Sequence, residues 1–194
     1  VLRTLRVVPL SLVFFFVMTL LLVRLLSQNR GTGAMCFSTS STDHQVARCT
    51  LERSAPMPSA VSARYPWIPT GFEALVRETR AVVGPDEKAW LLTVCDYSEV
   101  TESAHAWNEW ERQSLDAAHD DAAWSARIRA FWDSHFPILL SVKSGNAYFA
   151  IERSRHRVVC GEEPEYEETS VIAATVEELL LRVVERDPAL ARWI

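Results

Sequence analysis

The sequence has few of the features that build a metal or phosphate site. Its four cysteines form no CxxC pair, so the closely spaced thiolates of a zinc site are absent. No Walker-type loop or HExxH motif occurs, and Gly31-Thr32-Gly33 lacks the strand-to-helix context of a dinucleotide site. We therefore expect no metal, no cofactor and no enzymatic activity, with buried or incidental thiols in a reducing compartment at Cys36, Cys49, Cys95 and Cys160.

An acid–base pair is also missing. His135 lies two residues after Asp133, and side chains at i and i+2 of a helix point apart. Ser134 and Ser141 lie in no nucleophile-elbow sequence. We predict a solvated or capping role for this histidine.

Positive charge is scarce outside the N-terminus. Residues 1–34 contain four arginines and no acid, so the other residues hold 16 of the 20 basic and all 25 acidic residues, a balance of −9. An acidic body repels phosphate backbones, which excludes direct nucleic-acid binding and suits a basic protein partner. Glycine is sparse, with six residues, which argues against a fold built from loops.

The N-terminal 34 residues are dominated by an apolar run at positions 7–26. Its length approaches the roughly 20 residues of a bilayer span, and Arg3 and Arg6 precede it. Two interpretations carry equal weight: a membrane anchor, or a translation start at Met35 that removes the run. A cleaved signal peptide is weaker, because no small-x-small site closely follows. We expect a cytoplasmic protein, or a membrane-anchored one if residues 1–26 are translated and inserted.

Composition divides the chain into three parts. Residues 1–34 form the apolar segment, expected to be helical. Residues 35–66 are rich in Ser, Thr, Ala and Pro and predict a flexible linker. The folded domain is expected at 67–194.

The first half of this domain has helical periodicity. A capping box at Thr70 and Glu73 predicts a helix through Val83. Residues 89–94 predict a buried strand, although a helix fits equally well at this length. Tryptophans at helical spacing then predict two helices with a break between residues 115 and 121, and we expect these rings to pack in the core rather than form an exposed binding face. The tryptophans are Trp107, Trp110, Trp124 and Trp132.

The second half predicts hairpins. Residues 138–142, 147–151, 157–160 and 170–174 read as strands separated by turns, and a capping box at Thr175 starts a helix that ends at Asp187-Pro188. The chain is therefore predicted to be α+β, with a mainly antiparallel sheet of about four to six strands and helices packed around it.

One order of motifs is similar to a known family. Phe136-Pro137-Ile138 leads into a hairpin, Ile151-Glu152 and Val158-Val159 follow, and residues 171–180 come after an acidic loop. This order resembles the SUKH superfamily of bacterial immunity proteins and fungal cell-wall-synthesis regulator domains. Glu152 stands where aspartate is usual in that family.

The resemblance implies a non-enzymatic α+β domain. It implies an immunity-type protein that binds and neutralises a cognate bacterial toxin, often a nuclease or deaminase. The alternative is a membrane-anchored interaction or regulatory domain with an endogenous protein partner, which depends on the apolar segment.

The most distinctive polar segment is residues 162–168, with five carboxylates in seven residues. It lacks the alternating ligands of a calcium loop. A solvated loop without a role and a docking surface for a basic partner both remain open. For docking, Tyr166 would supply an aromatic anchor of the type enriched at interface hot spots, and the candidate surface comprises Glu162, Glu163, Glu165, Tyr166, Glu167, Glu168, Asp120 and Asp121, with Asp116 as an extension.

Overall fold

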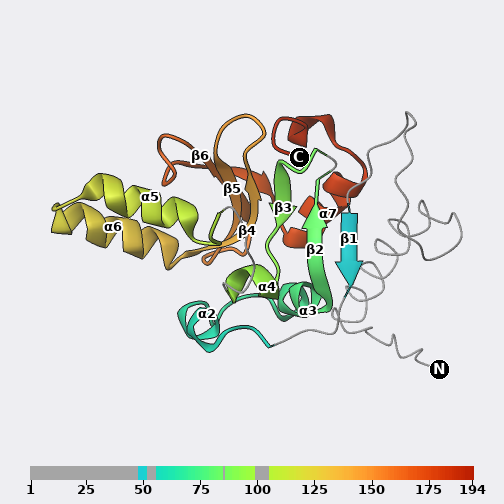
Figure 1. The fold of residues 1–194 in the computed structure, drawn as a ribbon, viewed down its shortest axis with the longest axis horizontal. Coiled ribbons are helices and arrows are strands. Elements are labelled where there is room, and N and C mark those ends of the chain that lie inside the picture. Colours follow the sequence, from blue (N-terminus) through green and yellow to red (C-terminus); the bar gives the residue numbers. More distant parts are fainter. Residues whose placement is uncertain (1–47, 52–55, 85, 99–104) are drawn as a thin grey trace, which may run out of the picture. The chain divides into compact units, whose positions relative to one another are not determined.

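The computed structural model of the chain describes residues 48–51, 56–84, 86–98 and 105–194. In these residues, seven strands form one antiparallel sheet whose spatial order follows the chain, from β1 to β7 (Figure 1). Seven exceeds the predicted four to six, because β1 and β2 were not expected. The strands are β1 (Arg48–Leu51), β2 (Thr79–Val83), β3 (Ala89–Leu91), β4 (His135–Ser141), β5 (Ala147–Glu152), β6 (Val158–Glu162) and β7 (Thr169–Ala173).

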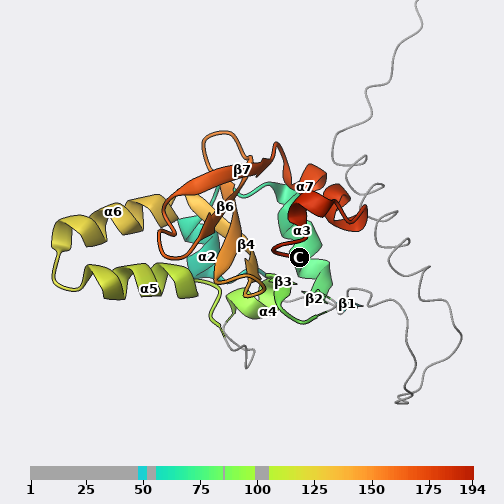
Figure 2. The ribbon, with the colours of Figure 1, turned by 90° about the horizontal axis from the view of Figure 1, so that it is seen from above.

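The four C-terminal strands confirm the predicted hairpins and the α+β class. Nearly every residue of β4, β5 and β6 is buried, because both faces of this part of the sheet are covered. On one face Tyr148 packs against Trp132, and on the other Phe149 packs against Trp193. Figure 2 shows the helix pair α5 (Glu109–Ala118) and α6 (Ala122–Trp132) on one side of these strands and α7 (Val176–Val184) on the other.

The predicted helix from residue 70 to 83 is wrong in its second half. Helix α3 spans Thr70–Glu78, and the chain then continues directly into β2. The apolar spacing fits both periods, and the strand forms because Val82 and Val83 pair with Leu91 and Trp90 of β3. The predicted capping box is also absent, since Pro69 occupies the N-cap position and no side chain caps this helix.

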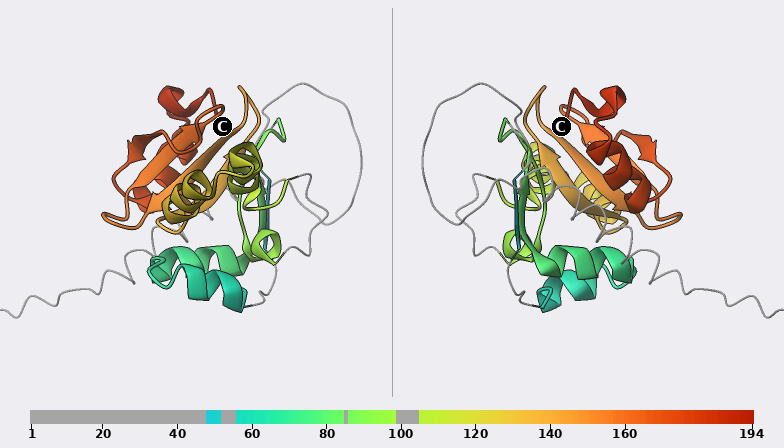
Figure 3. Two further views of the ribbon diagram at one scale, coloured as in Figure 1. Left: turned by 90° about the vertical axis from the view of Figure 1, so that its left-hand side faces the viewer. Right: turned by 90° about the vertical axis from the view of Figure 1, so that its right-hand side faces the viewer.

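Part of the predicted linker is folded. Helix α2 spans Ser59–Arg64, with Val61 and Tyr65 in the core, and β1 also lies within residues 35–66. The domain therefore starts before Trp67. Figure 3 shows α2 and α3 together at one end of the strands. The predictions for residues 1–47 and 52–55, the apolar segment included, lie outside the described residues.

The remaining helices follow the sequence more closely. The break between α5 and α6 falls at residues 119–121, inside the predicted interval. Thr175 caps α7 as predicted, while the Glu178 carboxylate accepts from the N–H of Ala174, one residue before the N-cap. Two short helices, α4 (Val94–Tyr97) and η1 (Pro188–Leu190), complete the described elements. No helix in the described ranges is both long and apolar enough to cross a bilayer.

Candidate functional site

The acidic loop, residues 162–168, runs from the end of β6 to the start of β7. Tyr166 is only 5% exposed, so its predicted role as an aromatic anchor for a partner is wrong. Its ring stacks on Trp110 with centroids 5.5 Å apart, and its hydroxyl donates to Oε1 of Gln113 at 3.1 Å. Burial raises the pKa of this phenol. Tyr166 therefore attaches the loop to α5 from the inside.

The backbone of the loop is held at the same point. The Tyr148 hydroxyl donates to the carbonyl oxygen of Tyr166 at 2.6 Å, and burial raises the pKa of Tyr148. This approach requires a glycine at position 161, because a Cβ there would lie 2.5 Å from that carbonyl oxygen and 2.5 Å from Cε1 of Tyr148. The loop thus crosses closely over β5 and β6.

Two of the five carboxylates are held by the protein at the start of the loop. Glu162 forms an ion pair with Arg192. Glu163 accepts from Nδ2 of Asn146 at 2.8 Å, while its own N–H donates to the carbonyl oxygen of Asn146 at 2.9 Å. These contacts join the loop to the C-terminal segment and to the β4–β5 turn.

The other three carboxylates of the loop differ in their contacts and exposure. Glu167 accepts from the indole N–H of Trp132 at 3.2 Å. Glu165 and Glu168 are exposed, and the N–H of Glu168 donates to the carbonyl oxygen of Glu165 at 3.0 Å. The loop therefore presents Glu163, Glu165 and Glu168 at its surface on a backbone that is fixed from below.

Asp120 and Asp121 lie at the α5–α6 turn, and both are exposed. Asp121 is the N-cap of α6, where its carboxylate accepts from the N–H of Trp124 at 2.8 Å. The acidic loop contacts α5 at Gln113, about two helical turns before this point. The structure therefore places the acidic loop against the middle of α5 and the last residue of α6, and Asp120 and Asp121 at the turn between the two helices, rather than in one patch.

One exposed aromatic residue was missed. Trp124 is 40% exposed beside Asp121, whereas Trp107, Trp110 and Trp132 are at most 8% exposed, as predicted. Trp124 belongs to the same helical stripe as Ile128 and Trp132, so its spacing predicts burial. Figure 1 shows the reason, because the turn end of the α5–α6 pair extends beyond the sheet.

Asp133 takes part in a structural ion network. The Arg64 guanidinium donates to both carboxylate oxygens of Glu111 at 2.7 Å and to Asp133 at 2.7 Å. Glu111 is 5% exposed, and its carboxylate raises the pKa of Arg64. This network joins α2, α5 and the end of α6.

His135 has a structural environment as well. Its Nδ1 lies 2.9 Å from the carbonyl oxygen of Phe131 and 3.0 Å from Oγ of Ser134, and its ring stacks on Phe131. Burial lowers the pKa of this imidazole. The hydrogen bonds and ion pairs of the described residues do not join it to Asp133.

The described residues hold no group of three His, Cys, Asp or Glu side chains suited to a metal ion. Cys95 and Cys160 are free thiols, and burial raises the pKa of Cys160 to about 12. A thiol so protonated is a poor nucleophile at neutral pH.

Comparison with known proteins gives no relative for this chain: no family model, no curated protein and no solved structure matches it.

Proposed function

We propose that this protein is a non-enzymatic binding domain of the immunity type, which neutralises a cognate bacterial toxin through its acidic surface. The toxin class that fits is a basic nuclease or deaminase domain, because a protein that grips phosphate carries positive charge where it binds. The resemblance of the motif order in residues 136–180 to the SUKH superfamily supports the same role.

The observation that carries the proposal is the fixed geometry of the acidic loop. A solvated loop without a role needs no internal support, yet this one is attached through Tyr166 to α5 and through Glu167 to Trp132. Binding a partner to a loop that is already ordered loses less conformational entropy. Carboxylates fixed in this way also attract a basic surface over a distance and speed its association.

The aromatic anchor of this proposal moves from Tyr166 to Trp124. Exposed tryptophans are enriched at the energetic centres of interfaces, and Trp124 lies in the first turn of α6, whose N-cap is the exposed Asp121. The turn of the α5–α6 pair is therefore a second contact region, separate from the acidic loop.

The test uses the two exposed loop carboxylates that have the fewest structural contacts. Partners captured from native cells are identified, and their affinity is measured for the variant Glu165→Lys with Glu168→Lys. We expect binding to weaken about tenfold or more, with a smaller dependence on salt. Unchanged affinity together with unchanged salt dependence would contradict the proposal.

A matched control carries the same charge change elsewhere. Glu78 and Glu185 are exposed at the C-terminal ends of α3 and α7, where a positive charge is compatible with the helix dipole. The variant Glu78→Lys with Glu185→Lys should bind the partner as the unaltered protein does. Equal weakening in both variants would show a general charge effect rather than a loop-specific one.

The alternative is a membrane-anchored interaction domain with an endogenous partner. The apolar run at residues 7–26 is the observation that favours it. Fractionation of native cells, with N-terminal sequencing of the recovered protein, tests it. Protein in the membrane fraction that retains residues 1–26 would support the alternative, and soluble protein that starts at Met35 would exclude it.

A further inference from the structure

Among the described strands, β7 forms one edge of the sheet and pairs only with β6. Its sequence, Thr-Ser-Val-Ile-Ala, contains no lysine, proline or acidic residue, although such residues commonly protect an edge from further pairing. Val171 at its centre is 53% exposed, more than any other large hydrophobic side chain in the described residues. Alternate residues of an edge strand direct their N–H and C=O groups outward. The edge is therefore suited to pair with another strand.

One position on this edge is already used. Arg182 of α7 donates to the carbonyl oxygen of Ile172, next to the point where the pairing with β6 shifts register. The segment Thr169–Val171 lies before that point, and all three of its residues are exposed. It is the part of the edge that a further strand can reach.

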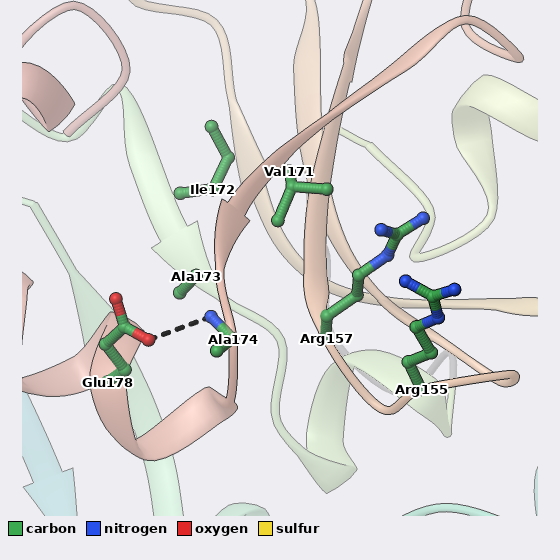
Figure 4. Close-up of a pocket in the computed structure, with 7 residues that line it drawn as sticks. All are labelled: Arg155, Arg157, Val171, Ile172, Ala173, Ala174 and Glu178. Atoms are coloured by element: carbon green, nitrogen blue, oxygen red, sulfur yellow. Dashed lines mark hydrogen bonds between the residues drawn. The ribbon is translucent and has the colours of Figure 1, made fainter.

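A hollow of about 390 Å³ lies beside β7. Figure 4 shows the Val171 side chain on the same side of β7 as the guanidinium groups of Arg155 and Arg157, which come from the β5–β6 turn, while Glu178 lies on the other side. The hollow thus combines an apolar side chain, two guanidinium groups and the backbone of an edge strand.

The charges in the hollow are not balanced. Arg157 is paired with Glu152, and the Glu178 carboxylate accepts from the N–H of Ala174 at 2.9 Å. Arg155 is exposed and has no ion pair with any described residue. Residues 35–194 have a net charge of −9. Within them, the arginine turn, residues 153–157, is a positive site that attracts a carboxylate.

We propose that this edge binds an extended acidic segment of a partner protein, which adds to β7 as an eighth strand. Its main chain pairs with Thr169–Val171, an apolar side chain contacts Val171, and a carboxylate two residues away on the same face pairs with Arg155. The carboxylate of this segment meets Arg155 rather than the carboxylates of the acidic loop, so the inference does not rest on the proposed toxin-binding role.

The test titrates the full chain with the end-blocked peptide Thr-Val-Thr-Glu-Thr-Glu-Thr, which places valine and glutamate on one face of a strand. We expect the amides of Thr169–Val171 to gain protection from hydrogen exchange and the variant Arg155→Glu to bind about tenfold or more weakly. The control Arg127→Glu, at an exposed position of α6, should bind as the unaltered chain does. Two further versions of the peptide carry N-methyl groups at alternate residues, in one on the amides that face β7 and in the other on the amides that face away from it. The first version should also bind about tenfold or more weakly than the parent peptide.

Several results would overturn the proposal. They are no binding of the parent peptide at millimolar concentration, equal affinity of the Arg155→Glu and Arg127→Glu variants, or equal affinity of both N-methylated peptides and the parent. A concentration-dependent dimer that Arg155→Glu abolishes would also overturn it, because the occupant of the edge would then be a second copy of this chain.

Discussion

The two ends of β6 carry opposite charges and are supported in different ways. At its C-terminal end the acidic loop is held by a buried tyrosine, by hydrogen bonds to Trp132 and Asn146 and by an ion pair to Arg192. At its N-terminal end the arginine turn, residues 153–157, is mainly exposed and borders an open hollow. The acidic loop is therefore anchored by a buried ring, whereas the arginine turn is held at the surface, where His156 stacks on Trp67 and Arg157 pairs with Glu152.

The largest expected effect breaks the support of the acidic loop. Tyr166→Ala removes a buried ring that stacks on Trp110 and should lower the free energy of unfolding by about 3 kcal/mol, as for other buried aromatic residues. Arg155→Ala at the other end should change it by less than about 0.5 kcal/mol. Urea denaturation of both variants measures the difference. Similar values would show that the two ends are supported alike.

A smaller effect is expected from crowding the loop. Gly161→Ala places a methyl group against the Tyr166 carbonyl and the Tyr148 ring, so the loop must move away. We expect a loss of about 1–3 kcal/mol in the free energy of unfolding, together with faster hydrogen exchange at the loop amides. Unchanged stability and unchanged exchange would mean that the close approach over β5 is unimportant for loop order.

The smallest effect concerns the end of the sheet beside the arginine turn, where His135 pairs with Glu152 in register. Burial lowers the pKa of His135 in the folded state, so the unfolded chain binds more protons. Stability from the neutral imidazole is complete above the unfolded pKa of about 6.5 and is lost as the pH falls through the folded value.

The urea midpoint of the unaltered chain should therefore fall more between pH 7.5 and pH 5 than that of His135→Gln. The other histidines are common to both proteins and cancel in this comparison. An identical pH dependence would refute a depressed pKa at this position.

The strands and helix ends of the C-terminal half could be predicted from local sequence patterns. The strands β4–β7, the α5–α6 break and the Thr175 cap each depend on neighbours in the chain, so their sequences are sufficient to locate them. The prediction of a helix through residue 83 was wrong after Glu78, because the spacing of Thr79, Val82 and Val83 suits either a helix or a strand. Pairing with β3 makes this segment a strand. The prediction of a flexible linker was wrong in part, because the segment has few large apolar residues but two of them, Val61 and Tyr65, are buried in the core.

The candidate site divides in the same way. The five glutamates of the loop and the negative charge of the body can be read directly from the sequence. The partners of these glutamates cannot, because Arg192, Asn146 and Trp132 are 17 to 35 residues away along the chain. Tyr166 is buried and Trp124 is exposed, the reverse of the prediction, because contacts between distant segments decide which ring is covered.

The sequence by itself determined the acidic character, the α+β class and the positions of the C-terminal strands, because these depend on composition and on contacts between near neighbours. Only the tertiary structure decided which carboxylates reach the surface and that β7 lies at an edge of the described sheet. Burial is a property of the assembled fold: the same residue type is an anchor or an exposed contact according to what packs over it.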